Sequence, residues 1–224
     1  MKNRILIIFL ICLISCNKTV NTDIEINAVQ QVLNFYNGVC IKYKGFEVKN
    51  EIKKQYFELE ISKSDLLENS IHNIESHSAN IAYLFYSNLK NEKLNYDEIR
   101  VKINLKESTQ EFKYSAKELE EVEKLQSDIN KINNYIISKD YNSLQQKFST
   151  SINIKTENIK QLFTLIENKY GVVKKIQFQG FRFAHTDYGD VIIFNEALCL
   201  EKINAEINLI IKRDNKQIIS IEIP

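Results

Sequence analysis

The chain has 224 residues, with 30 lysines and arginines against 29 aspartates and glutamates, so its formal net charge at pH 7 is +1. A net charge this close to zero gives no sign of the basic face expected of a nucleic-acid-binding protein. The share of apolar residues, 44%, is too high for a disordered chain. Five glycines and one proline, Pro224, are too few for a β-sandwich rich in Gly/Pro turns.

The first predicted element is an apolar run from Ile5 to Ile14, preceded by the basic residues Lys2 and Arg4. A helix that crosses a bilayer needs about 20 apolar residues, so this run is too short to span one. Its length and its basic flank are typical of the hydrophobic region of a signal peptide. The sequence therefore predicts a leader over residues 1–15.

The end of this run, Leu13-Ile14-Ser15-Cys16, resembles the lipobox of bacterial lipoproteins. The resemblance implies that cleavage falls between Ser15 and Cys16, that Cys16 carries a diacylglycerol on its sulfur, and that the new N-terminus is acylated. Two or more acyl chains on one residue anchor a protein stably. An ordinary secretory signal with a chance cysteine and a short signal anchor are the alternatives.

The residues after the cysteine bear on localisation. In Gram-negative lipoproteins an aspartate at this position typically signals inner-membrane retention, so Asn17 implies, by the same resemblance, the outer membrane. Residues 16–23 form a polar tether without the acidic cluster of some surface-exported lipoproteins, which favours the periplasmic face. Loss of Lys2 and Arg4 with the leader changes the formal charge from +1 to −1.

Apolar spacing predicts an N-terminal domain over residues 24–115 with the order α-β-β-α-β-β. Helices are expected at about 24–37, followed by Gly38, and from Ser64 or Asp65 to about residue 90. The expected strands are residues 40–49, the alternating segment around Phe57–Ile61, the segment Ile99–Leu105, and a last one holding Phe112 and Tyr114.

A C-terminal domain is predicted over residues 116–224. Its long first helix, which could serve both halves, has apolar residues at every third or fourth position: Leu119, Val122, Leu125, Ile129, Ile132 and Ile136. A helix at 156–170 and four extended segments follow. The first extended segment changes its apolar parity at Gly180, which predicts a β-bulge that bends the strand.

Helices followed by a bent four-stranded antiparallel sheet resemble the NTF2-like or cystatin-like α+β superfold. The segment from Ile137 to Leu144 resembles its helix-to-helix step, and the segment from Ile166 to Gly171 resembles its passage from helix to sheet. The resemblance covers about residues 125–224. Because this superfold hosts enzymes, ligand binders, immunity proteins and interaction modules, it implies no single function.

Two cysteines remain in the mature chain, Cys40 and Cys199, because Cys12 leaves with the leader and Cys16 is lipidated. In the oxidising envelope a disulfide between them is one alternative, and two small buried thiols are the other. The sequence holds no pair of cysteines spaced for structural zinc. We expect no metal and no cofactor.

Histidines give two candidate sites. His72 and His77 lie on one predicted helix, but five residues put them about 140° apart, so we expect no shared metal and partly exposed side chains. The segment His185–Asp190, which includes Asp187, holds an imidazole, carboxylates and a phenol that suit acid–base catalysis, and it equally suits a polar turn. Pairing of His185 with Cys199 as a nucleophile lacks an orienting third group.

The sequence favours binding over catalysis. The face Ile203, Ala205, Ile207, Leu209 and Ile211 is wholly aliphatic, which predicts a packed or apolar cone. We therefore expect a non-enzymatic lipoprotein that is tethered by its lipidated cysteine and binds an envelope protein. The alternatives are a carrier of a small apolar ligand in the C-terminal cone and a hydrolase that uses the His185 loop. An exposed apolar patch favours the first, and an enclosed apolar pocket favours the carrier.

Overall fold

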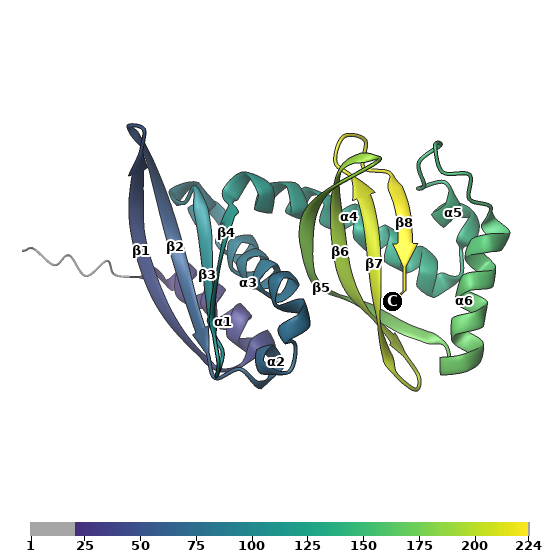
Figure 1. Cartoon of the computed structure of the whole chain (residues 1–224), viewed down its shortest axis with the longest axis horizontal. Coiled ribbons are helices and arrows are strands. Elements are labelled where there is room, and N and C mark those ends of the chain that lie inside the picture. Colours follow the sequence, from purple (N-terminus) through teal and green to yellow (C-terminus); the bar gives the residue numbers. More distant parts are fainter. Residues whose placement is uncertain (1–20, 224) are drawn as a thin grey trace, which may run out of the picture.

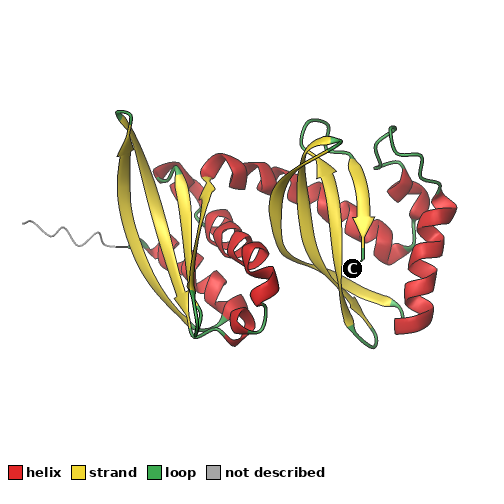
Figure 2. Ribbon diagram, viewed as in Figure 1, coloured by secondary structure: helices red, strands yellow, loops and turns green. Residues whose placement is uncertain are grey.

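The computed structural model describes residues 21–223, which form two four-stranded sheets with their helices (Figures 1 and 2). The predicted α+β class is confirmed. The predicted leader, the predicted cleavage after Ser15 and the predicted lipid attachment at Cys16 all fall outside the described residues. No helix between residues 21 and 223 combines the length and the apolar character of a membrane span.

The first half has the predicted order α-β-β-α-β-β. Its elements are α1 Asp23–Tyr36, β1 Val39–Lys49, β2 Ile52–Ser62, α2 Asp65–Glu68, the 3₁₀ turn η1 Ile71–Asn73, α3 Ile74–Asn88, the 3₁₀ turn η2 Lys90–Asn95, β3 Glu98–Asn104 and β4 Thr109–Ser115. The strands lie in the order β1-β2-β3-β4, and the β2–β3 pair is parallel while the other two are antiparallel. Edge strands are therefore β1 and β4.

Local sequence explains these elements. Thr22 and Glu25 form a capping box that starts α1. Asn50 and Glu51 both have positive φ, as a two-residue hairpin between β1 and β2 requires. One face of the sheet is buried against α1 and α3, and its residues are those that the alternation predicted: Phe57, Leu59, Ile61, Ile99, Val101 and Ile103.

The prediction of one continuous helix from Ser64 to residue 90 is wrong. Ser64 does cap a helix, accepting a hydrogen bond from the Leu67 N–H, but α2 ends after one turn and α3 starts only at Ile74. Asn69 and Ser70 lie at the break, and short polar side chains of this kind compete with the helical backbone for hydrogen bonds. As a result Ile71, which lies within the range of the predicted helix, is half exposed.

The second half consists of helices followed by an antiparallel sheet, as predicted. Its elements are α4 Ala116–Ser138, α5 Tyr141–Gln145, α6 Thr156–Tyr170, β5 Val173–Thr186, β6 Gly189–Leu200, β7 Asn204–Lys212 and β8 Ile218–Glu222. The strands lie in sequence order, and every pair is antiparallel. The β5–β6 register shifts between Phe178 and Gly180, which confirms the predicted bulge.

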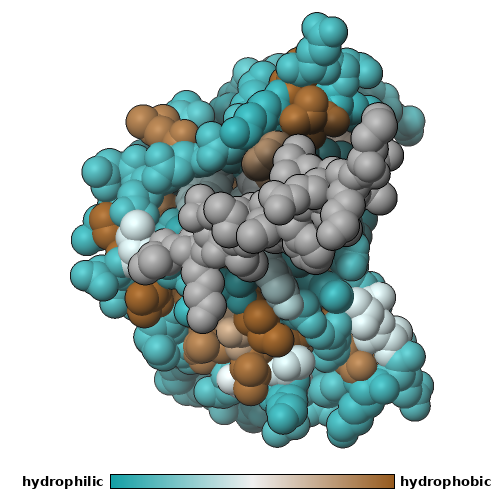
Figure 3. All heavy atoms as spheres, turned by 90° about the vertical axis from the view of Figure 1, so that its left-hand side faces the viewer, coloured by the Kyte–Doolittle hydropathy of each residue, from teal (hydrophilic) through white to brown (hydrophobic). Residues whose placement is uncertain are grey.

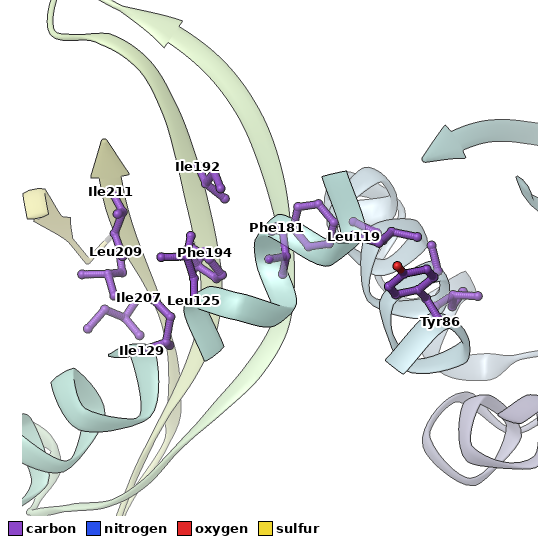
Figure 4. Close-up of a cluster of buried hydrophobic side chains, with 14 of the residues drawn as sticks. Tyr86, Leu119, Leu125, Ile129, Phe181, Ile192, Phe194, Ile207, Leu209 and Ile211 are labelled. Atoms are coloured by element: carbon purple, nitrogen blue, oxygen red, sulfur yellow. The ribbon is translucent and has the colours of Figure 1, made fainter. Parts of the chain in front are cut away.

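The core runs through both halves. Ile207, Leu209 and Ile211 are buried, and Figure 4 shows them on the same side of the sheet as Leu125 and Ile129 of α4. The aliphatic face is therefore packed with side chains from α4. Near the start of α4, Leu119 lies close to Phe181 of β5 and Tyr86 of α3 (Figure 4), so this helix contacts both halves. The division into two domains at residue 115 stays a prediction.

Candidate functional site

The His185 segment is the β5–β6 hairpin. His185 Nδ1 lies 2.8 Å from Asp190 Oδ1, and both side chains are largely exposed. The imidazole lowers the pKa of the Asp190 carboxyl through this hydrogen bond. Thr186 donates from its hydroxyl to the Gly189 carbonyl, a contact typical of a turn. The His185–Asp190 pair therefore lies at the tip of an exposed hairpin and helps to order it.

The structure does not bring Cys199 to His185. Cys199 pairs with Lys175 near the base of the hairpin, whereas His185 pairs with Asp190 at its tip. Cys199 lies nine positions after Asp190 along β6, which corresponds to about 30 Å of strand. The thiol nucleophile considered for a hydrolase is therefore not assembled.

Both cysteines among the described residues, Cys40 and Cys199, are free thiols in the structure. Cys40 lies on β1 of the first sheet, and Cys199 lies on β6 of the second. The disulfide alternative is thus not formed, and each cysteine is a small, partly buried side chain. Burial raises the pKa of the Cys40 thiol to about 12, which makes it a poor nucleophile.

The two histidines have different environments. His72 is exposed in η1, whereas His77 is buried in α3, so the expectation of partial exposure is wrong for His77. Its Nδ1 lies 3.3 Å from the Tyr36 hydroxyl, which also accepts a hydrogen bond from Asn80 Nδ2. Burial lowers the pKa of His77, which favours the neutral ring. This network joins α1 to α3, and residues 21–223 hold no cluster of three or more metal-ligating His, Cys, Asp or Glu side chains.

A polar cleft of about 480 Å³ lies between the α2–α3 region and the outer face of the second sheet. Ser76 Oγ of α3 donates to Asn195 Oδ1 on β6 at 2.5 Å, and Asn73 Nδ2 donates to Glu206 on β7 at 3.3 Å. Asn195 also donates to Asn208. Because these side chains hydrogen-bond one another, they connect the two halves and are not free to bind a ligand.

Sequence reasoning missed a buried carboxyl group. Glu196 of β6 is only 2% exposed, and Asn133 Nδ2 of α4 donates to its Oε1 at 2.7 Å. Burial raises the pKa of Glu196 to about 7. The signal was present in the alternation, because Glu196 has the same parity as the core residues Phe194 and Leu198.

An exposed apolar row runs along β1, at the edge of the first sheet. Strand β1 has eleven residues. Its side chains Val39, Ile41 and Tyr43 lie on the face opposite the helices, and each is nearly half exposed. At the end of the hairpin Phe46, Val48 and Ile52 are more exposed still. Figure 3 looks onto this end of the molecule, where apolar patches stand out from a mostly hydrophilic surface.

No family model, curated protein or solved structure matches the chain. The candidate sites are therefore compared by their own chemistry. The His185 hairpin has no nucleophile beside it among the described residues, and the cleft is internally hydrogen-bonded. The edge of β1 differs from both because it combines exposed apolar side chains with a strand edge that no other described strand covers.

Proposed function

We propose that the protein is a lipid-anchored, non-enzymatic interaction module of the bacterial cell envelope, placed on the periplasmic face of the outer membrane. The anchor rests on the sequence, where the leader, Ser15 and Cys16 have the lipobox spacing. The interaction rests on the structure, where the apolar edge strand β1 is the one observation that carries it. The partner is another envelope protein.

Two of the other sheet edges, β4 and β8, are less suited to binding. Strand β4 has seven residues, and its outer face holds the polar side chains Thr109, Glu111 and Lys113. Strand β8 has five residues, and a bridge between Phe148 and Ile218 already covers part of its edge. A long, apolar, unpaired edge is a ready template for another strand, and proteins usually protect such an edge.

The carrier alternative has one observation in its favour. A groove of about 220 Å³ in the second half lies between α6 and β8, and its apolar lining includes Phe148, Ile152, Leu162, Phe163 and Ile221. Ligand pockets of drug-sized molecules occupy about 300–1,000 Å³, so this groove is small. It also lies outside the predicted cone, which side chains of α4 fill. The interaction module is therefore the better supported function.

The anchor predicts the outcome of a cysteine substitution. Cys16→Ala is expected to abolish incorporation of a labelled fatty acid and to remove the protein from the membrane fraction, because the acylated sulfur is lost. Cys12→Ala, in the same leader, is the matched control and should keep both properties. Fatty-acid labelling followed by gel analysis measures this, and a Cys16→Ala protein that still carries label would contradict the anchor.

The interaction predicts a contact at β1 in the native membrane. A photo-crosslinking amino acid at Tyr43 is expected to join the full chain to one discrete envelope protein, because this side chain lies exposed on the edge strand. The same amino acid at Lys117, an exposed position on α4, is the control and should give no such product. If no position on the chain yields a discrete product, the proposed interaction function is refuted.

A further inference from the structure

We propose that the tip of the β1–β2 hairpin is a second membrane contact, which inserts apolar side chains among phospholipid headgroups and binds anionic headgroups through lysines. This tip, the finger, consists of residues 46–55. The inference rests on the proposed lipid anchor and deepens the proposed function, because it names the surface that the anchored chain touches. Three observations carry it: the projection of the finger, its exposed apolar and basic side chains, and its place beside the start of α1.

The finger projects beyond the rest of its sheet. Strands β1 and β2 pair along their whole lengths, whereas the pairing of β2 with β3 begins only at Tyr56 and Glu98. Residues 46–55 therefore form a two-stranded ribbon, and Figure 1 shows this hairpin extending past the ends of β3 and β4. Every residue of the finger is exposed. The finger can thus contact another surface without displacing any described element.

Three large apolar side chains are exposed on the finger. Phe46 and Val48 are each 60% exposed, and Ile52 is 63% exposed. Phe46 and Val48 continue the face of the hairpin on which Phe57 is buried in the core, since residues two apart in a strand share a face. Ile52 lies on the opposite face, where it pairs with Lys49. A group of exposed apolar side chains marks a surface that binds protein or membrane.

The charge of the finger favours a membrane with anionic lipids. Three lysines lie among its apolar side chains: Lys49, Lys53 and Lys54. None of these lysines has an ion pair among the residues that the structure describes. Of the two acidic residues in the finger, Glu47 pairs with Arg100 at 2.6 Å, so only Glu51 offsets the lysines. Apolar and basic side chains together are typical of segments that lie in the headgroup region of a membrane.

The base of the finger lies beside the start of α1. Glu25 Oε2 accepts a hydrogen bond from the Thr22 N–H at 2.9 Å, and the same oxygen lies 2.5 Å from Lys44 Nζ on β1. One carboxylate therefore holds the first turn of α1 against β1. Val48 follows Lys44 by four positions, which is about 13 Å of strand.

The length of the tether brings the finger within reach of the bilayer. Cys16 lies six positions before Thr22, so an acylated Cys16 holds Thr22 within about 20 Å of the headgroups. The length of strand from Lys44 to Val48 is shorter than this reach. The finger can therefore touch the leaflet that holds the acyl chains. Two contacts would fix the orientation of the folded body, whereas a tether alone leaves it free to rotate.

A tryptophan in the finger tests this contact, because the chain contains none of its own. The purified full chain with Phe46→Trp is mixed with excess vesicles of phosphatidylethanolamine and phosphatidylglycerol that carry brominated acyl chains. Bromine quenches an indole that enters the bilayer, so its emission is expected to fall by about half or more relative to vesicles without bromine. Tyr188→Trp, at the exposed tip of the β5–β6 hairpin, is the matched control and should keep its emission.

Removal of charge tests the part that the lysines play. Adding Lys49→Gln and Lys54→Gln to the Phe46→Trp protein is expected to lower the ratio of inserted to free finger about fivefold for each lysine. The extent of quenching gives this ratio. Lys117→Gln, at an exposed position on α4, is the control for the loss of a positive charge and should leave the ratio unchanged.

Two results would overturn the inference directly: quenching of the Phe46→Trp protein no stronger than that of the Tyr188→Trp protein, or no response to removal of the lysines. A photo-crosslinking amino acid at Phe46 that joins a protein in the native envelope, without quenching by bromine, would also overturn it in favour of a protein partner. Flotation of the wild-type chain with vesicles tests the anchor separately. A chain that floats through its acyl groups without quenching keeps the anchor and refutes the finger, whereas quenching in a chain without acyl groups supports the finger and refutes the anchor.

Discussion

Gly180→Ala is expected to lower the free energy of unfolding by about 3–5 kcal/mol. A Cβ at this position would lie 1.9 Å from the backbone carbonyl oxygen of Ser76 on α3. Since that oxygen belongs to a helix backbone, it cannot rotate away as a side chain could. The φ of +153° at Gly180 adds backbone strain for any residue with a Cβ.

Gly189→Ala is the matched control for this prediction. Gly189 also has a positive φ, +98°, but no atom lies within 4 Å of the Cβ that alanine would add. It should therefore cost only the backbone strain, about 1–2 kcal/mol. Urea unfolding of the full chain in detergent, followed by circular dichroism, measures both values. Equal losses in the two variants would show that the contact between β5 and α3 does not constrain the fold.

Glu196→Gln is expected to stabilise the protein by about 3 kcal/mol at pH 8 and to have little effect near pH 4. In the folded chain the pKa of Glu196 is raised to about 7 from its usual value near 4.5, because the side chain is buried. At pH 8 the wild type must hold a buried carboxylate, whereas glutamine is neutral. Glutamine also retains an oxygen that can accept from Asn133 Nδ2.

The sign follows from proton binding. Between pH 4.5 and 7 the folded state retains a proton on Glu196 that the unfolded state has released, so stability falls as pH rises through this window and is level above it. The neutral acid can donate a hydrogen bond, and Asn133 Oδ1 is a buried acceptor without a partner among the described residues. A neutral Glu196 and Asn133 can therefore bind each other reciprocally.

Unfolding in urea at several pH values measures the difference between the variant and the wild type. His77, whose pKa is lowered by burial, gives both proteins a pH dependence of the opposite sign. Because this contribution is common to the variant and the wild type, the difference in their free energies of unfolding isolates the effect of Glu196. Glu111→Gln, at an exposed position on β4, is the control and should change the free energy of unfolding by no more than about 0.5 kcal/mol. A Glu196→Gln protein that is no more stable than the wild type at pH 8 would show that the carboxylate is better solvated than its burial indicates.

Periodicity predicted most of the fold because the chain keeps one face of each element apolar. The alternation of Ile99, Val101 and Ile103 identified a half-buried strand, and the spacing from Leu119 to Ile136 identified α4. It failed between Ser64 and Ile74, where short polar side chains end a helix that the apolar stripe would have continued. The competition of short polar side chains with the helical backbone for hydrogen bonds leaves no trace in the spacing of apolar residues.

Candidate sites were less predictable because they depend on pairs that are distant in sequence. The parity of Glu196 with Phe194 marks it as inward-facing, but nothing in the sequence brings Asn133 to it across 63 residues. His77 was predicted to be partly exposed, but it is buried, and its ring lies beside the Tyr36 hydroxyl of α1. Likewise, the alternation of β1 did not show that it would lie at the edge of its sheet.

The sequence alone determined the α+β class and the bulge at Gly180, because each depends on residues that are adjacent or periodic. The leader and the lipobox resemblance at Cys16 stay predictions. Only the tertiary structure decided that Gly180 also lies against the Ser76 carbonyl, that Glu196 is a buried acid, and that β1 is an edge strand among the described residues. These three depend on which elements pack together. The near-zero net charge and the scarcity of glycine therefore excluded whole classes of protein, namely nucleic-acid-binding proteins and β-sandwiches rich in Gly/Pro turns. The environment of each single residue depended on how the elements pack.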